Sequence, residues 1–239
     1  MFFDIHSHIL GGVDDGAKDL DESIELLEDM YSQGITDIIA TPHFYPQSDI
    51  LEDFLETVNS KFCELKNAIK HKNLPNIYLG CEVFYYSGIS KASALQKLTL
   101  NDSNYILLEP NSSLLGYGFQ KELLYFRDTL GITPIIAHIE RYHKEKGYKK
   151  LITFIKENNI LTQVNASSFT NRHYARTLKK LIKDDVISFI ATDTHSKNHR
   201  PPQLSEAHCI IEKKYGNDYK SKLIKNSQEF FSEITGKKD

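Results

Sequence analysis

The sequence predicts an α/β barrel in which parallel strands alternate with helices. Seven short runs rich in β-branched or aromatic residues recur along the 239-residue chain, and most are apolar on both faces, as buried parallel strands are. Amphipathic helical patterns separate most of these runs, so neighbouring strands are expected to pair in parallel through crossovers. The chain length suits one barrel domain covering residues 1–239.

The elements can be placed in chain order. Strands are expected at 2–5, 36–40, 76–81, 105–109, 133–137, 161–165 and 187–192. Helices are expected at 20–33, 51–71, 119–130, 147–157, 172–183 and 203–214, with one or two short helices over 217–235. Asp19 and Glu22 are placed as a capping pair for the first helix, and Gly34 marks its end. No repeat or long flexible linker suggests an internal domain boundary.

The ends of the apolar runs carry the functional signal. His6 and His8 are two residues apart, so on a strand they face the same side, roughly 6–7 Å from each other. The active site of an α/β barrel lies at the C-terminal ends of its strands. Candidate metal ligands are found at or just after such ends: His6, His8, Asp15, His43, Glu82, Glu109, His138, Asp193 and His195.

Nine nitrogen and oxygen ligands exceed the needs of one tetrahedral site and suit two or three ions that share a bridging carboxylate. Such mixed sites accept Mn, Fe, Co or Zn. A surface position is the prediction for His71, His173 and His208, which fall in helical or loop contexts. His143 and His199 lie near the site loops but lack a strand-end position.

Composition limits the partners. A formal net charge of -3 predicts no general attraction to nucleic acid or to an anionic membrane. No apolar run approaches the ~20 residues of a membrane span, and Met1–Asp4 do not read as a signal peptide. Cys63, Cys81 and Cys209 form no disulfide framework or zinc motif, which favours reduced thiols in the cytoplasm. The oligomeric state is not indicated.

Three familiar phosphatase and phosphohydrolase chemistries are disfavoured by the sequence. None of the cysteines has an arginine six residues later, the spacing that a cysteine-based phosphatase loop requires. The Asp19-Leu20-Asp21 segment resembles a phospho-aspartyl motif but opens a helix instead of closing a strand, so capping is the better interpretation. No Gly-rich loop ending in Lys-Ser/Thr is present, which argues against a nucleoside triphosphatase.

Several sequence blocks carry a family resemblance across the whole chain. They are Asp4–His8, Val13–Ala17, Ala40–His43, Gly80–Glu82, Ala137–Tyr142, Gln163–Ser168, Ala191–His195 and Arg200–Pro202. On these blocks the chain resembles the polymerase-and-histidinol-phosphatase (PHP) superfamily. Within it, the chain is similar to the bacterial manganese-dependent protein tyrosine phosphatases of capsule and exopolysaccharide loci. One departure is Gly11-Gly12, where a proline is expected before the aspartate pair.

The resemblance implies a distorted, TIM-like (β/α)7 barrel that holds two to three divalent ions, with Mn2+ as the expected metal. It implies three ligand groups: His6, His8, Glu82 and Asp193 for one ion; Glu82, Glu109 and His138 for a second; Asp15, His43 and His195 for a third. It also implies a phosphotyrosine protein substrate, with the tail of a bacterial tyrosine kinase of polysaccharide export as the expected partner.

The expected reaction is phosphomonoester hydrolysis by attack of a metal-bridging hydroxide on phosphorus. Arg141 and Arg200 follow ligand residues by three and five positions and are expected to bind phosphate oxygens, a task suited to the planar guanidinium. The alternative within enzymes is a small-molecule phosphatase such as a histidinol-phosphate phosphatase. A non-catalytic barrel predicts lost ligands, and none is lost. A metal-dependent amide hydrolase leaves both arginines unexplained.

Overall fold

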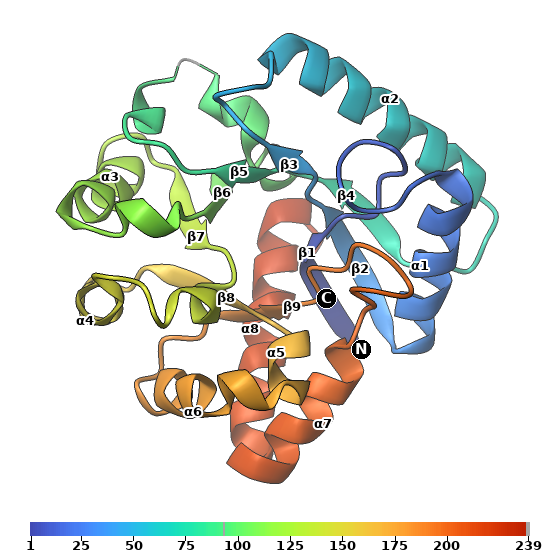
Figure 1. Ribbon diagram of the computed structural model, residues 1–239. Coiled ribbons are helices and arrows are strands. Elements are labelled where there is room, and N and C mark those ends of the chain that lie inside the picture. The colour runs from blue at the N-terminus through green and yellow to red at the C-terminus, as the bar shows by residue number, and fades with distance from the viewer. Residues whose placement is uncertain (93, 238–239) are drawn as a thin grey trace.

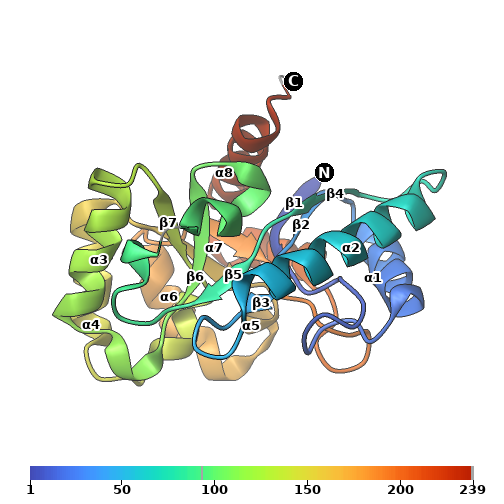
Figure 2. The same cartoon turned by 90° about the horizontal axis from the view of Figure 1, so that it is seen from above.

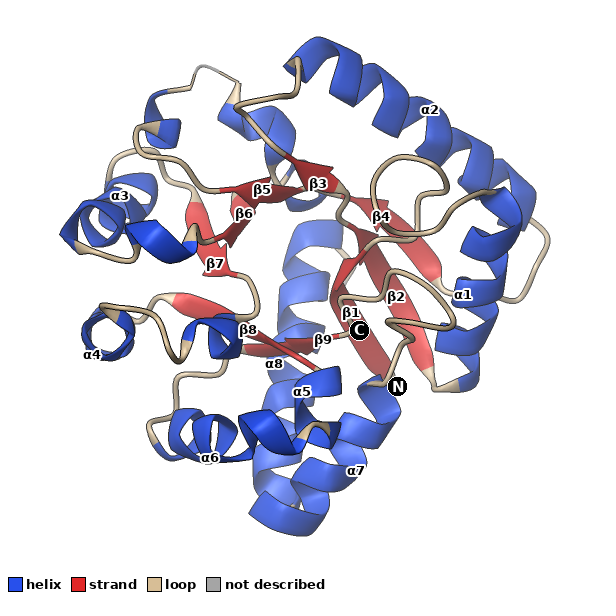
Figure 3. Ribbon diagram, in the orientation of Figure 1, coloured by secondary structure: helices blue, strands red, loops and turns tan. Residues whose placement is uncertain are grey.

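Parallel strands form the frame of the molecule, and most of the helices lie outside them (Figures 1 and 3). The computed structural model describes residues 1–92 and 94–237. The strands are β1 (Phe2–Ser7), β2 (Ile35–Ala40), β3 (His43–Phe44), β4 (Asn76–Leu79), β5 (Glu82–Phe84), β6 (Tyr105–Glu109), β7 (Thr133–Ile136), β8 (Leu161–Asn165) and β9 (Phe189–Ala191). They form two sheets, β1-β2-β4 and β3-β5-β6-β7-β8-β9, in which every strand pair is parallel.

One of the seven predicted strands is interrupted, and a short strand that was not predicted follows another. The strand expected at 36–40 is confirmed as β2, and a further short strand, β3, begins after Pro42. The strand expected at 76–81 stops at Leu79, and the next strand, β5, begins at Glu82. Proline has no N–H for the ladder, so a sheet breaks there readily. Gly80 lies at the break after Leu79, where a Cβ atom would be 2.6 Å from a methyl group of Leu100 and 3.1 Å from a methyl group of Ile39. The prediction of 76–81 as one strand is therefore wrong.

The two sheets meet where β1 lies beside the end of β9. Ser7 forms a parallel bridge with Thr194, and the His8 N–H donates to the Thr194 carbonyl over 2.8 Å. The Asp193 N–H in turn donates to the carbonyl of His6 over 2.9 Å. These bonds curl the sheets toward each other, and the distorted barrel predicted from the sequence is confirmed.

The helices follow the predicted order. They are α1 (Leu20–Ser32), α2 (Leu51–Ile69), α3 (Tyr117–Asp128), α4 (Tyr148–Asn158), α5 (Ser167–Thr170), α6 (Ala175–Lys183), α7 (Leu204–Tyr215) and α8 (Asn217–Thr235). The predicted capping pair of α1 is confirmed: the Asp19 carboxylate accepts the Glu22 N–H over 2.9 Å. Gly34 follows the helix with φ 81°, a conformation that favours glycine. The 172–183 prediction missed the short helix α5 and placed the start of α6 too early.

Helix α8 closes one end of the frame. Phe230 and Phe231 of α8 pack in one buried cluster with Ile39, Leu107 and Ile135 from three strands. The loops that follow β1 and β9 lie at the opposite end of the strands (Figure 2). No helix in the described part of the chain is long and apolar enough to cross a membrane.

Candidate metal centre

The structure brings the predicted ligand residues together at the C-terminal ends of the strands. They come from β1 or the loop after it (His6, His8, Asp15), from β3 and β5 (His43, Glu82), from the end of β6 (Glu109), and from the segments after β7 and β9 (His138, Asp193, His195). Three groups of their nitrogen and oxygen atoms are close enough to hold a metal ion. The role of each residue as a ligand stays a prediction.

Two of these residues have an unusual backbone conformation. His138 directly follows the end of β7 with φ 31°, and Asp193 follows β9 with φ 50°. Residues other than glycine rarely adopt positive φ, and the strain is tolerated where the surrounding structure fixes it. At both positions the chain leaves the strand abruptly and turns a side chain into the site.

The deepest group consists of His6, His8, Glu82 and Asp193, all buried. The Nε2 atoms of His6 and His8 lie 3.1 Å apart. They lie 3.1 and 3.2 Å from Glu82 Oε2, and each lies 3.5 Å from Asp193 Oδ1. Ligands about 2.0–2.2 Å from a tetrahedral ion are about 3.3–3.6 Å from one another. The spacing of these four atoms therefore fits one ion.

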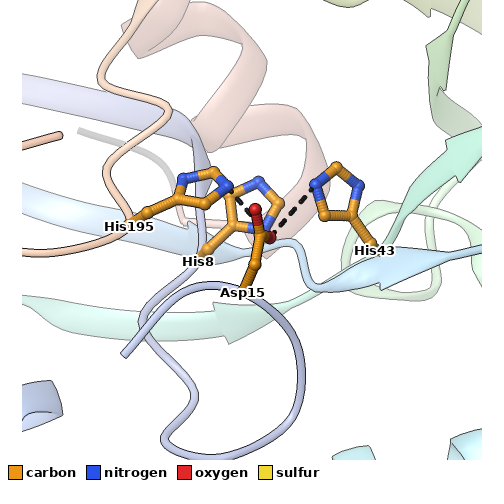
Figure 4. A group of neighbouring side chains, drawn as sticks. All are labelled: His8, Asp15, His43 and His195. Carbon is orange, nitrogen blue, oxygen red and sulfur yellow. Dashed lines mark ion pairs between the residues drawn. The ribbon is translucent and has the colours of Figure 1, made fainter. Parts of the chain in front are cut away.

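A second group lies nearer the solvent and is shown in Figure 4: His8, Asp15, His43 and His195. Asp15 Oδ1 lies 3.3 Å from His195 Nε2 and 3.5 Å from His43 Nε2. The Asp15 side chain is 67% exposed, in contrast to the buried imidazole of His195. This group matches the one expected for a third ion, with His8 added.

The third group joins His43, Glu82 and Glu109. His43 Nδ1 lies 3.1 Å from Glu82 Oε2 and 3.8 Å from Glu109 Oε2. His138, expected in this place, approaches the same carboxylates from the other side, with Nε2 2.9 Å from Glu82 Oε1 and 3.7 Å from Glu109 Oε1. Glu82 thus lies between the groups, which is the position a bridging carboxylate needs.

Hydrogen bonds behind the histidines set their orientation. His8 Nδ1 lies 2.7 Å from Asp14 Oδ2, so a proton on Nδ1 leaves Nε2 free to face the group. His6 Nδ1 likewise lies 3.2 Å from the amide oxygen of Gln163. His195 Nδ1 lies 3.0 Å from the Asp193 backbone carbonyl. Each imidazole is therefore held with a ring nitrogen turned toward a candidate ion position.

Several buried polar atoms in these groups have no hydrogen-bond partner among the described residues. They are Glu82 Oε2, Asp193 Oδ1, His43 Nδ1 and His195 Nε2. Buried polar atoms are usually hydrogen-bonded, and an unsatisfied one costs about 1–3 kcal/mol. Divalent ions would satisfy all four, and the mixture of imidazole and carboxylate donors suits Mn, Fe, Co or Zn. The residues present therefore fit a multinuclear metal site.

Burial and mutual charge shift the pKa values in the site. Burial disfavours the carboxylate of Glu82, yet His6 and its other histidine neighbours hold its pKa well below the usual range. Burial lowers the pKa of His138 to about 4 and that of His195 to about 3. Burial, together with the nearby charge of Glu82, raises the pKa of Glu109 to about 7. The neutral imidazoles of His138 and His195 and the ionised carboxylate of Glu82 are the forms that bind metal.

The two predicted arginines reach the site from its rim. Arg141 Nη2 donates to Asp193 Oδ2 over 2.5 Å, and Arg200 Nη2 donates to the same oxygen over 2.6 Å. Asn165 donates to it as well, over 2.6 Å. Both arginine side chains are 36% exposed, whereas the Asp193 side chain is 1% exposed. One oxygen of Asp193 therefore faces the deepest group and the other holds the two guanidinium groups.

The sequence analysis missed residues that support the ligands. Asp14 accepts hydrogen bonds from the backbone N–H groups of His43 and Gly16, in addition to its contact with His8. Gln163 accepts from the His138 N–H over 2.7 Å and donates to Asn165 over 2.8 Å. All three lie in the blocks that carried the family resemblance, which was the only signal for them.

Glycines let the loop after β1 pack against the site. A Cβ atom on Gly16 would lie 2.2 Å from the His8 carbonyl oxygen, and one on Gly11 would lie 2.3 Å from the carbonyl carbon of Asp19. The backbone of Asp19 thus approaches Gly11 closely, and a side chain at this position would require the loop to shift. The loop brings Asp14 and Asp15 over the histidines.

Of the histidines expected at the surface, His71 and His173 are exposed, but His208 is not. Its ring is 4.6 Å from the ring of Phe2 and stacked on it at 5°. The helical periodicity of α7 did not show that β1 would cover this position. The prediction for His208 is therefore wrong.

Comparison with known proteins gives a consistent result. A family model described as capsular polysaccharide synthesis, CpsB/CapC, matches residues 2–232. The tyrosine-protein phosphatase CpsB of Streptococcus agalactiae serotype III (strain NEM316) is 32% identical over 236 residues, covering 94% of this chain and 96% of that protein. The tyrosine-protein phosphatase YwqE of Bacillus subtilis is 30% identical, covering 94% of this chain and 89% of that protein.

Solved structures agree. A crystal structure from work on YwqE of Bacillus subtilis and CpsB of Streptococcus pneumoniae, described as metal-dependent tyrosine phosphatases, superposes with a TM-score of 0.83 at 26% identity, covering 95% of this chain and 92% of that one. The histidinol phosphate phosphatase of Lactococcus lactis shares the fold, with a TM-score of 0.56 at 13% identity over 89% of this chain and 93% of that one. The chain belongs to the CpsB/CapC family of capsular polysaccharide synthesis proteins.

Proposed function

We propose that this protein is a metal-dependent protein tyrosine phosphatase. The observation that carries the proposal is the double use of Asp193: one oxygen converges with His6, His8 and Glu82 on a candidate ion position, and the other accepts from two arginines. An anion held at the ions would therefore lie within reach of the guanidinium groups. The similarity to curated tyrosine phosphatases supports the same reaction.

The arginines would bind phosphate oxygens. Each guanidinium has five N–H donors in a planar fork, and the hydrogen bonds to Asp193 use Nη2 of each. The remaining donors can hold a phosphate bidentately, and the partial exposure of both side chains lets them meet a substrate that enters from solvent. Asp193 fixes both arginines in place before substrate arrives.

The three atom groups support two or three ions, with Mn2+ proposed as the native metal. His6, His8, Glu82 and Asp193 would hold one ion, and Asp15, His43 and His195 with His8 a second. Glu82 and Glu109, with His138 or His43, would hold another. When bound, divalent ions lower the pKa of water and neutralise the charge of phosphate oxygens. The negative carboxylates of the site would offset the positive charge of the bound ions.

The proposed substrate is a phosphotyrosine in the tail of a bacterial tyrosine kinase of polysaccharide export, which places the activity in the cytoplasm. The family description, capsular polysaccharide synthesis, supports this assignment. A phenolate leaving group has a conjugate pKa near 10, so its departure needs less protonation than that of an alkoxide.

The test compares three substrates on one metal-analysed preparation. We expect turnover of p-nitrophenyl phosphate and of phosphotyrosine peptides, a much lower kcat/KM for histidinol phosphate, and loss of all activity after metal removal. Re-addition of Mn2+ should restore it. Activity that survives verified metal removal would disprove the mechanism, and a preference for histidinol phosphate would favour the small-molecule alternative.

A further inference from the structure

A pocket opens directly beside the solvent-side metal group. It has a volume of about 510 Å³ and lies between the loop after β1, the end of β3 and the first turns of α2. Asp15 and His43 form the wall that it shares with the metal group. Tyr45, Ile50 and Phe54 also line it. A substrate whose phosphate lies at the candidate ion positions could therefore place a neighbouring side chain in this pocket.

The lining combines apolar faces with negative charge. Tyr45 is 39% exposed and Ile50 is 64% exposed, a high exposure for apolar side chains next to a reaction centre. Asp49 and Asp53 also line the pocket, and the described lining contains no lysine or arginine. Aromatic faces and carboxylates together bind the ammonium or guanidinium group of a long side chain, whose methylene stem packs on the apolar surface.

The pocket is partly pre-organised. Asp49 accepts the Tyr45 N–H over 2.6 Å and the Ser48 hydroxyl over 3.1 Å, which fixes the turn before α2. The Tyr45 ring lies 5.2 Å from the ring of His43, stacked at 27°. Asp53 lies in the first turn of α2, where a carboxylate also offsets the helix dipole. Offsetting the helix dipole explains the carboxylate of Asp53, but it does not explain why Tyr45 and Ile50 are exposed beside it.

We infer that this pocket binds a lysine or arginine side chain of the substrate, within three residues of the phosphotyrosine. The inference rests on the proposed phosphatase function and adds a sequence preference to it. The charge on the opposite side of the molecule gives a competing prediction for the residues that flank the phosphotyrosine. Residues 141–183 contain eleven Lys or Arg and two Asp or Glu, and they include helices α4 and α6 (Figure 1). A substrate guided mainly by that side would need acidic neighbours instead.

The experiment measures kcat/KM for phosphotyrosine peptides with glutamine at the three positions on either side. Each glutamine is replaced in turn by lysine or by glutamate. The wild-type protein should prefer lysine at one or more positions by about 3- to 30-fold, the size expected of an exposed ion pair with one cation–π contact. Asp53→Lys should abolish or reverse that preference at the same position.

The matched control is Glu56→Lys, which makes the same charge change on α2 outside the pocket lining. It should keep the lysine preference. The inference is overturned if the wild type shows no lysine preference, if it prefers glutamate throughout, or if Glu56→Lys removes the preference as fully as Asp53→Lys does. Turnover of p-nitrophenyl phosphate without turnover of any peptide would also overturn it while leaving a metal phosphatase. Failure on both substrates would remove the proposed function itself.

Discussion

The two ends of the strands bury opposite kinds of side chain. At the end covered by α8, Phe230 and Phe231 pack with Leu107 and Ile135, so burial removes apolar surface from water. At the other end the buried side chains include Glu82 and others that carry charge. Burying a charge costs free energy unless it is paired or coordinates a metal. One end therefore stabilises the fold, and the other uses that stability to hold reactive groups in place.

The strongest test of this difference is Glu82→Ala. Because Glu82 lies in two of the candidate metal groups, its loss should lower metal content and reduce turnover by at least about a thousandfold. Elemental analysis and assay of p-nitrophenyl phosphate hydrolysis measure both effects. His71→Ala is the matched control, since His71 is exposed, and should leave both unchanged. Full metal content with near-normal turnover in Glu82→Ala would contradict the bridging role.

The opposite end should respond to mutation through stability. Phe230 is 4% exposed, so Phe230→Ala should lower the free energy of unfolding by about 3–5 kcal/mol, because it leaves a cavity in the cluster beneath the strands. Urea denaturation measures this. In the folded fraction, metal content per molecule should match the wild type. A loss of metal without a loss of stability would show that the two ends are not separate.

Between these extremes lie the arginines at the rim. Arg200→Ala should leave metal content intact and lower kcat/KM for a phosphotyrosine peptide by roughly 10- to 150-fold, the loss of one charge-assisted contact. Arg200→Lys should recover only part of this loss, since an ammonium cannot replace the bidentate fork. Inhibition by inorganic phosphate should weaken in parallel. Unchanged phosphate affinity in Arg200→Ala would show that Arg200 does not bind the phosphate.

Asp14 tests whether support behind the ligands matters. Asp14→Asn should reduce metal affinity or activity by about 10- to 100-fold, because the amide orients His8 less firmly than the carboxylate does. The readout is the concentration of Mn2+ that gives half-maximal activity, compared between wild type and variant. An identical metal dependence would show that the Asp14–His8 contact is not needed for binding.

The smallest effect concerns His208, a buried histidine outside the metal groups. Burial lowers its pKa to about 4, below the ordinary value of 6.5. Between these values the unfolded chain binds the proton more strongly, so stability is full above pH 6.5 and falls as the pH drops toward 4. The wild type should therefore lose up to about 2 kcal/mol of unfolding free energy from this group between pH 7 and pH 5, and His208→Leu should not show this loss. Urea denaturation of both proteins at pH 7 and pH 5 measures this. An equal difference in unfolding free energy between variant and wild type at the two pH values would contradict it.

Much of the frame could be read from local patterns. Short apolar runs located seven strand tracts, because these strands are buried on both faces, and periodicity located most helices, because burial of one helix face leaves a repeat in the sequence. The residues at the strand ends could be named as candidate ligands because parallel strands in a barrel end at a common face. Asp19 and Glu22 could be recognised as a cap since their contact is local.

Tertiary structure decided what depends on residues far apart in the chain. His6 meets Gln163 across 157 positions, and no periodicity predicts such a pair. The close packing of Leu100 against Gly80 and the stacking of Phe2 on His208 are likewise contacts between distant segments. The sequence by itself determined which groups stand at the strand ends, since that follows from spacing along one chain segment. Which atoms of those groups face each other was decided only by the packing of separate segments, because orientation depends on contacts that no single segment contains.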